Sequence, residues 1–232
     1  DKYFRFGVDW GGATSQLAIT PGSDIDVTPN TTYSLNTSCT TNGAMKYNVT
    51  NTSYNYVFKT LNAGTNPTGT FVFFEVQGAV RSVSNVTQTP LAANVTDCGE
   101  TTITATLDGD LAAGQAVYLR YTNNGYATSK VVTLTGSGST YTGKIPSSFN
   151  AVGSNVSYYV FTSGDSNVAT NGSNADLYTI NLNNNGGLNY SYTVVAGGAT
   201  TYIPDDNFEQ ALIALGLDCT LDNYVYTSNI SS

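Results

Sequence analysis

The side chains that could do chemistry in this chain are aromatic rings, amides, hydroxyls and carboxylates, because histidine is absent. Without imidazole, the commonest general base and the Ser-His and Cys-His nucleophile pairs are missing. Carboxylates can still hydrolyse glycosides, but Asp108 and Asp110 only bracket Gly109 in a tight turn. No glycine-rich phosphate loop lies between a strand and a helix. The residue types therefore predict a protein that binds a ligand and is not an enzyme, with a carboxylate enzyme as the least favoured alternative.

Trp10 is the single tryptophan and the first candidate for ligand binding. It follows Asp9 and precedes Gly11-Gly12 at the end of an expected strand, where its face could be exposed. Sugars stack on exposed aromatic faces, and a neighbouring carboxylate adds directional hydrogen bonds. Tyr121 and Tyr126 flank an Asn-Gly turn and form a second candidate contact. The competing interpretation of each ring is burial in a core.

Oxygen-rich turns offer candidate ligands for calcium. Asp165, Asp176 and the loop 183–187 carry carboxylate and amide oxygens, which are the donors that Ca²⁺ prefers. No EF-hand or nonapeptide spacing accompanies them, so solvated turns are the alternative interpretation. Asp205 and Asp206 are better explained as helix caps. We expect no bound cofactor, with Ca²⁺ as the one ion that these residues could hold.

The three cysteines are Cys39, Cys98 and Cys219. They are widely separated and form no C-x-x-C pair, which disfavours a zinc or redox centre. An odd number allows at most one internal disulfide, which would form in an oxidising compartment. Three buried thiols are the alternative, and the spacing does not indicate which two cysteines would pair.

Composition restricts the partners. Charged residues make up only 10% of the chain, and the net charge is −8. Nucleic-acid binding needs a basic patch, which eight Lys and Arg residues cannot form. The negative charge also disfavours anionic membranes, and no apolar run reaches the roughly 18 residues of a transmembrane helix. A neutral polysaccharide or a surface protein remains as the expected partner, without nucleic acid and without membrane insertion.

The elements that must position these residues are short strands. Thr and Tyr favour strands, and the many Asn and Gly residues favour turns. Segments 54–58 and 101–107 alternate with a period of two, and turn residues recur about every 8–12 residues, as in sandwiches. We predict an all-β fold of two tandem β-sandwich domains, the second like immunoglobulin or fibronectin III domains, with a short C-terminal helical segment.

The strand pattern divides the chain into three parts. Residues 1–83 are expected to form a β-sandwich that opens with a strand at Tyr3–Asp9, and residues 84–197 an immunoglobulin-like sandwich. In the second sandwich, the Asn-Gly dipeptide at Asn124-Gly125 predicts a hairpin, and residues 177–180 are expected to be a strand.

Residues 198–232 differ in kind and are expected to begin a further domain. With Asp206 as the N-cap, Glu209 would complete a capping box at the start of a helix. Gly216 would end that helix. One short helix has too little core to stand alone, so we expect it to dock on another element.

Three stretches resemble known modules. Tyr202–Leu212, with Leu215-Gly216 and Leu221-Asp222, resembles the N-terminal cap that precedes leucine-rich repeats in surface proteins of Bacteroidetes bacteria. The second domain is similar to immunoglobulin-like modules of secreted proteins and glycosidases from the same bacteria, and the residues that carry this likeness are 119–126, 158–165, 177–181 and 189–192. Residues 4–12 and 32–35 are similar to starch-binding β-modules of their outer-surface glycan-uptake proteins.

These resemblances imply a secreted or cell-surface multidomain protein of the flavobacterial type, exported by the type IX route. The last residues show no natural stop, which favours a fragment of a longer protein. We expect a non-catalytic extracellular binding or spacer region of a larger secreted or surface-anchored protein, with weak carbohydrate binding to neutral glycans. The alternative is an adhesion or structural stalk protein whose following repeats bind protein partners.

Overall fold

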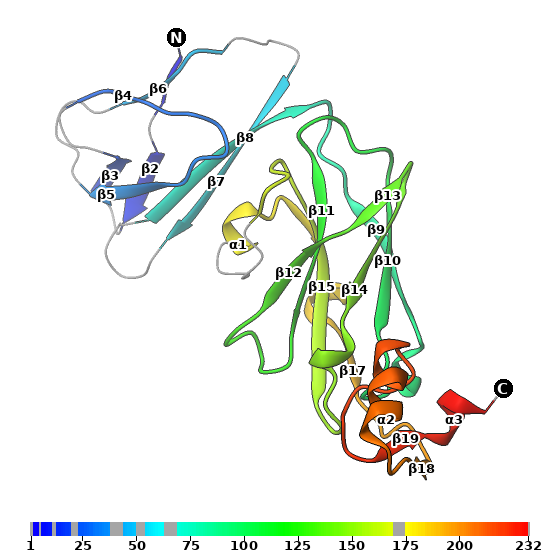
Figure 1. The fold of residues 1–232 in the computed structure, drawn as a ribbon. Helices are drawn as coiled ribbons and strands as arrows, with labels where there is room; N and C mark the ends of the chain where they lie inside the picture. Colours follow the sequence, from blue (N-terminus) through cyan, green and yellow to red (C-terminus); the bar gives the residue numbers. More distant parts are fainter. Residues whose placement is uncertain are drawn as a thin grey trace.

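The computed structural model describes residues 2–4, 6–10, 13–19, 23–37, 44–49, 54–62, 69–168 and 175–231. Strands dominate these residues and the helices are few and short, which confirms the predicted all-β fold with a short C-terminal helix. Three groups of elements follow one another, with the two termini at opposite ends of the molecule (Figure 1). Within the described ranges, no helix has the length and apolar character needed to span a membrane.

The first unit consists of two sheets that enclose an aromatic core. Its strands are β1 (Lys2–Phe4), β2 (Phe6–Trp10), β3 (Ala13–Ala18), β4 (Ile25–Asp26), β5 (Tyr33–Thr37), β6 (Met45–Tyr47), β7 (Tyr54–Asn62) and β8 (Gly69–Gln77). The strand orders are β1-β6-β4 and β2-β3-β5-β8-β7. Met45 of the small sheet packs with Leu35, Phe71 and Phe73 of the large one. The single strand expected over Tyr3–Asp9 is wrong, because β1 and β2 belong to different sheets.

Strand β8 is buried on both faces because it takes part in two cores. Phe71 and Phe73 lie in the core of the first unit, whereas Val72, Phe74 and Val76 belong to a cluster with residues of the second unit. Successive side chains of a strand point to opposite faces, so the apolar run of β8 supplies both cores. We call this second cluster the apolar junction.

The second unit is a sandwich of two sheets. Its elements are β9 (Val83–Thr89), η1 (Ala92–Asn94), β10 (Thr101–Leu107), β11 (Ala116–Thr122), β12 (Lys130–Thr133), β13 (Thr135–Ser137), β14 (Thr140–Ile145), η2 (Ser147–Phe149), β15 (Asn155–Ser163), α1 (Ala175–Tyr178), β16 (Asn181–Asn183), η3 (Asn185–Gly187) and β17 (Tyr190–Thr193). One sheet has the order β13-β14-β10-β9, and the other has β12-β11-β15-β16, with β17 also on β15. Ile103 and Ala105 of the first sheet face Leu119 and Val160 of the second in one buried cluster.

The structure confirms one local prediction in this sandwich and corrects another. β11 and β12 form the predicted antiparallel hairpin, in which Gly125 has a φ of +66°. The strand expected over 177–180 is instead the helical turn α1. Leu177 and Tyr178 are both buried in the apolar junction. A strand would send these neighbours to opposite faces, whereas one helical turn directs both toward β8.

The C-terminal unit is small. It contains β18 (Thr200–Tyr202), α2 (Asp206–Ala214), β19 (Tyr224–Tyr226) and α3 (Thr227–Ile230). β18 and β19 form a two-stranded antiparallel sheet. The buried apolar side chains of this unit are Ile203, Leu212 and Val225. So small a core needs support from the neighbouring sandwich.

Helix α2 begins one residue earlier than predicted and ends where predicted. Asp205 is the N-cap, and its carboxylate accepts hydrogen bonds from the backbone N–H groups of Asn207 and Phe208. The capping box is therefore wrong: Glu209 turns inward and accepts from the backbone N–H groups of Asp222, before β19, and of Tyr224, its first residue. Gly216 ends the helix with a φ of +73°, and its N–H donates to a carbonyl of the last turn.

Candidate functional site

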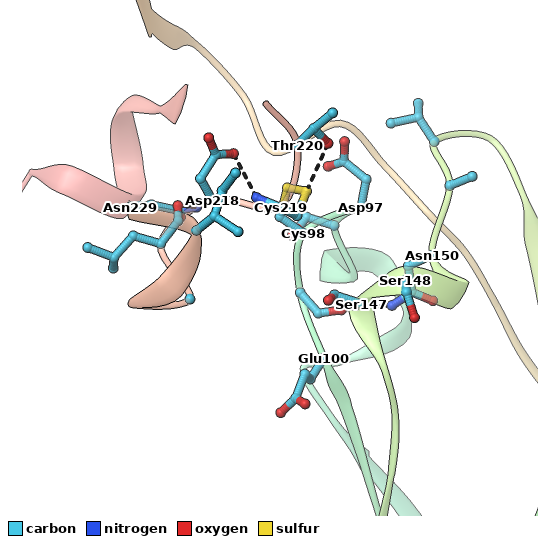
Figure 2. A pocket seen from close by; sticks show the side chains of 17 residues that line it. Asp97, Cys98, Glu100, Ser147, Ser148, Asn150, Asp218, Cys219, Thr220 and Asn229 are labelled. Atoms are coloured by element: carbon cyan, nitrogen blue, oxygen red, sulfur yellow. Dashed lines mark hydrogen bonds between the residues drawn. A yellow bond between two sulfur atoms is a disulfide. The ribbon is translucent and has the colours of Figure 1, made fainter. Parts of the chain in front are cut away.

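An open cleft of about 930 Å³ lies between the end of the sandwich and the C-terminal unit (Figure 2). The sandwich contributes residues 96–100 before β10 and residues of η2 and the following turn as far as Val152. The C-terminal unit contributes Ile213, residues 216–220 and Asn229. Most of these side chains end in hydroxyl, amide or carboxylate groups, and no aromatic ring is among the described residues that line the cleft.

A disulfide between Cys98 and Cys219 joins the two walls of the cleft. The two cysteines are 121 residues apart in the sequence. The sequence left the pairing open, and the structure assigns it to these two. Cys39 lies outside the described residues. Figure 2 shows the sulfur atoms between Asp218 on one wall and Asp97 on the other.

Hydrogen bonds hold the sandwich wall of the cleft. Asn150 is buried, and its amide nitrogen donates to the carbonyl of Gly99 over 2.8 Å. Its amide oxygen accepts from the hydroxyl of Tyr192, also over 2.8 Å. Asn150 thereby ties the segment before β10 to the turn after η2, so the wall that carries Cys98 has a defined shape.

Carboxylates stand on both sides of the disulfide. Asp97 accepts a hydrogen bond of 2.8 Å from the hydroxyl of Tyr226, a residue of β19. Burial, together with the neighbouring Asp97, raises the pKa of Tyr226, so this hydroxyl stays protonated and remains a donor. Asp218 is only 9% exposed, and one of its oxygens accepts from the N–H of Cys219. At the rim, Lys144 pairs with Glu100 over 2.5 Å.

The structure places the predicted sugar platform only in part. Asp9 and Trp10 belong to β2, where they pair with Thr14 and Ala13 of β3. Their side chains lie outside the described part of the chain, so their role in ligand binding stays a prediction. Tyr121 is 4% exposed and packs edge-on against another ring in the sandwich core. It therefore has no free face for a sugar, which corrects the expectation for this residue.

Tyr126 is half-buried and takes part in a different cluster. The guanidinium of Arg120 lies 5.2 Å from the centre of its ring, which is a cation–π contact. Burial raises the pKa of the Tyr126 hydroxyl. Tyr126 packs against the apolar junction, whereas Tyr121 lies inside the sandwich. The two rings therefore do not form one contact surface.

The two candidate calcium ligands are separately engaged. Asp176 accepts a charged hydrogen bond of 2.7 Å from Arg120. Asp165 is buried and accepts from the N–H of Asn167 over 2.7 Å. The structure does not bring them into one ligand set. In the described residues, the only group of three His, Cys, Asp or Glu residues with clustered ligand atoms is Cys98, Asp218 and Cys219, and its two sulfurs are bonded to each other.

No protein-family model matches the chain, and no curated protein does. The function is therefore inferred from the geometry of the molecule. Sequence reasoning missed the cleft and its carboxylates. One signal was available: both cysteines of the disulfide follow an aspartate, at Asp97-Cys98 and Asp218-Cys219, and a disulfide between them brings two carboxylates to one place.

Proposed function

We propose that the chain is a non-catalytic extracellular binding and spacer region of a larger secreted or surface-anchored protein. The observation that carries this proposal is that both junctions between successive units are fixed. Phe74 of the first unit is fully buried against the second, and Cys98 is covalently bound to the third unit. When the units are held at fixed positions, a binding site on one unit stays at a defined distance from the neighbouring domains of the larger protein.

The apolar junction is what makes the first connection stiff. Val72, Phe74 and Val76 pack with Tyr118 and Phe161, which lie on the outer face of the sandwich. Their relative orientation follows from interlocking side chains in a dry contact, because a close-packed core tolerates little displacement. A disulfide in the second connection suits an extracellular compartment, where such bonds persist.

Weak binding of a neutral glycan is the activity that the cleft supports best. Hydroxyl and amide groups such as those of Ser147, Ser148 and Asn229 line it, and these groups can exchange hydrogen bonds with sugar hydroxyls. No basic side chain lines the described cleft, which disfavours anionic ligands. The lack of an aromatic platform on its described walls is consistent with low affinity.

Affinity gel electrophoresis in neutral polysaccharides tests this proposal. We expect the native chain to be retarded in at least one of them. Ser148→Leu should abolish the retardation, because this exposed serine lines the cleft and the change replaces a hydroxyl with a bulkier apolar side chain that offers a sugar neither a hydrogen bond nor an aromatic face. Ser137→Leu is the matched control, since Ser137 is an exposed residue of β13 that does not line the cleft. Equal retardation of both variants would contradict glycan binding at this site.

The same rigid connections support a structural stalk as the second candidate. In that case no neutral polysaccharide would retard the chain, while the distance between the first and third units would stay fixed. Spin labels at exposed positions of the first sandwich and of α2, measured by pulsed electron resonance, should give one narrow distance distribution. A broad distribution would rule out the spacer function in either form.

A further inference from the structure

The outer face of the small sheet in the C-terminal unit carries exposed aromatic rings. In the antiparallel pairing of β18 with β19, Tyr202 lies opposite Tyr224, and Thr200 lies opposite Tyr226. Side chains alternate between the two faces of a strand, so these residues share one face while Val225 points into the core of the unit. Tyr202 is 60% exposed and Tyr224 is 48% exposed. Their ring centres lie 5.4 Å apart and form one aromatic surface, which we call the tyrosine pair.

Backbone hydrogen bonds and a third tyrosine hold the tyrosine pair in place. The N–H of Tyr224 donates to the fully buried carboxylate of Glu209 over 3.1 Å. The hydroxyl of Tyr226 donates to Asp97 of the sandwich over 2.8 Å. The ring of Tyr226 also lies against Gly197, where an added Cβ would come within 2.5 Å of it. Because the sheet is held from both sides, a ligand that covers the exposed rings has little conformational freedom to remove from them.

The tyrosine pair adjoins the cleft through a smaller cavity of about 70 Å³. Tyr224 lines this cavity, together with the exposed side chains of Thr200 and Asp222. Four residues line both the cavity and the cleft: Asp97, Cys98, Asp218 and Thr220. The aromatic surface that the described walls of the cleft lack is therefore present next to it, on the other side of the disulfide.

The chemistry around the tyrosine pair selects a neutral sugar. No lysine, arginine or histidine follows Lys144 in the sequence, and none of the described residues that line the cavity is basic, which disfavours an anionic ligand. A sugar ring stacks its C–H surface on aromatic rings. Its hydroxyls exchange hydrogen bonds with hydroxyl and carboxylate groups, which Thr200, Thr220 and Asp222 supply beside Tyr224.

The size of the tyrosine pair agrees with this choice. Two tyrosine rings of this exposure offer roughly 200 Å² of surface. Each partner in a stable protein interface buries about 800 Å², so the pair alone is too small to hold a protein domain. A surface of two rings does suit one sugar ring.

We propose that Tyr202 and Tyr224 stack against one sugar ring of a neutral polysaccharide, and that neighbouring sugar units of the same polymer occupy the cleft. This inference rests on the proposed function, in which the cleft binds such a glycan. Once one unit is stacked, the contact of the next with the cleft is intramolecular, which raises the affinity for a polymer above that for a single sugar.

Affinity gel electrophoresis in hydroxyethyl cellulose, galactomannan and amylopectin tests the tyrosine pair. In each polymer that retards the native chain, Tyr202→Ala and Tyr224→Ala should each raise the apparent dissociation constant about five- to tenfold. Tyr202→Phe keeps the ring and should bind like the native chain. Tyr3→Ala is the matched control, because Tyr3 is 59% exposed and belongs to β1 near the opposite end of the molecule (Figure 1).

Saturation-transfer NMR with oligosaccharides of the retarding polymer gives a second, local readout. Saturation of the aromatic protons should reach the C–H protons of the bound sugar in the native chain and in Tyr3→Ala. The double variant Tyr202→Ala/Tyr224→Ala should lose most of this transfer, because the described walls of the cleft carry no aromatic ring.

The outcomes separate the tyrosine pair from the cleft. Retardation that is unchanged in Tyr202→Ala and Tyr224→Ala but abolished in Ser148→Leu would overturn the role of the pair and leave glycan binding in the cleft intact. That result is also the one expected if the two rings cover a protein partner. No retardation of the native chain in any of the three polymers would refute glycan binding at both places.

Unfolding is excluded as a cause by urea midpoints equal to that of the native chain. Tyr202 is exposed, so its replacement leaves the core of Ile203, Leu212 and Val225 intact. If Tyr224→Ala does not fold, the comparison of Tyr202→Ala with Tyr202→Phe decides. Equal retardation of these two variants would contradict stacking on the ring.

Discussion

The two junctions of this molecule are built in opposite ways. At the apolar junction, Val72, Phe74 and Val76 are removed from water against the outer face of the sandwich. At the second junction, an open polar cleft separates the units, and the Cys98–Cys219 disulfide joins them. The first connection relies on burial of apolar surface, and the stabilising free energy is roughly proportional to the apolar area that is buried. The second relies on a covalent bond and on polar contacts such as the hydrogen bond from Tyr226 to Asp97.

This difference shows how a chain with few charges connects domains of unequal size. The first unit has its own aromatic core and can spare one face of β8 for its neighbour. The C-terminal unit has a small buried core of Ile203, Leu212 and Val225, and its other large apolar side chains, such as Phe208 and Leu215, stay exposed and are not buried against the sandwich. The disulfide therefore holds this unit to the sandwich, and it stabilises the fold by reducing the conformational entropy of the unfolded chain.

Breaking the disulfide should have the largest effect. The double variant Cys98→Ser/Cys219→Ser frees a loop of 121 residues, and loops of this length lose about 4–5 kcal/mol of stabilisation in the chain-entropy model. We expect hydrogen exchange to show loss of protection in α2 and β19, while β8 and β15 keep theirs. Unchanged protection of α2 would show that the polar contacts suffice. Cys39→Ser serves as the control for the loss of a sulfur outside this bond.

Truncating a side chain of the apolar junction should lower the free energy of unfolding somewhat less than breaking the disulfide does. Phe74→Ala removes a fully buried ring, and such changes cost about 3–5 kcal/mol. Urea unfolding should show this loss, and the hydrogen exchange of α2 should not change. Phe58→Ala is the control in the same unit, because Phe58 is 44% exposed and should contribute only about half as much. Equal losses in both variants would refute a special role for the outer face of β8.

Alkaline pH should weaken the apolar junction by a smaller amount. Burial raises the pKa of Tyr118 from 10.0 to about 12. Between these values the unfolded chain loses this proton before the folded chain does, so stability is full below pH 10 and falls as the pH rises toward 12. The shift corresponds to about 2–3 kcal/mol. Urea midpoints measured from pH 9 to 12 should decrease. Tyr118→Phe should make that decrease smaller without removing it, because burial also raises the pKa of other tyrosines, among them Tyr126 and Tyr158. A midpoint independent of pH in the native chain would contradict this assignment.

Periodicity and turn residues predicted correctly those strands and helices whose form is set by residues nearby in the sequence. The alternation in 101–107 correctly indicates β10, and Gly216 correctly marks the end of α2. The helical turn α1 was missed because Leu177 and Tyr178 are buried by β8, a strand about a hundred residues away in the sequence. Local propensity carries no information about such a contact.

The candidate site was harder to predict than the fold. Tyr121 and Tyr126 have the same local setting beside an Asn-Gly turn, yet one lies in the sandwich core and the other under Arg120. The register of β11 against β15 decides the face of the sheet on which Tyr121 lies, whereas Tyr126 lies in the turn after β11 with a φ of +65°. The cleft carboxylates Asp97 and Asp218 gave no local signal apart from the cysteine that follows each of them.

By itself the sequence determined the all-β class, a C-terminal helix that ends at Gly216, and the absence of imidazole and of basic charge in the last third of the chain. These follow from residue type and from spacing over one turn or one strand. Only the tertiary structure decided that Cys98 bonds to Cys219, and that Asp97 meets Asp218 and Asp222 around one cavity. Those contacts join residues more than a hundred positions apart, and their energy appears only when both units have folded and been brought together.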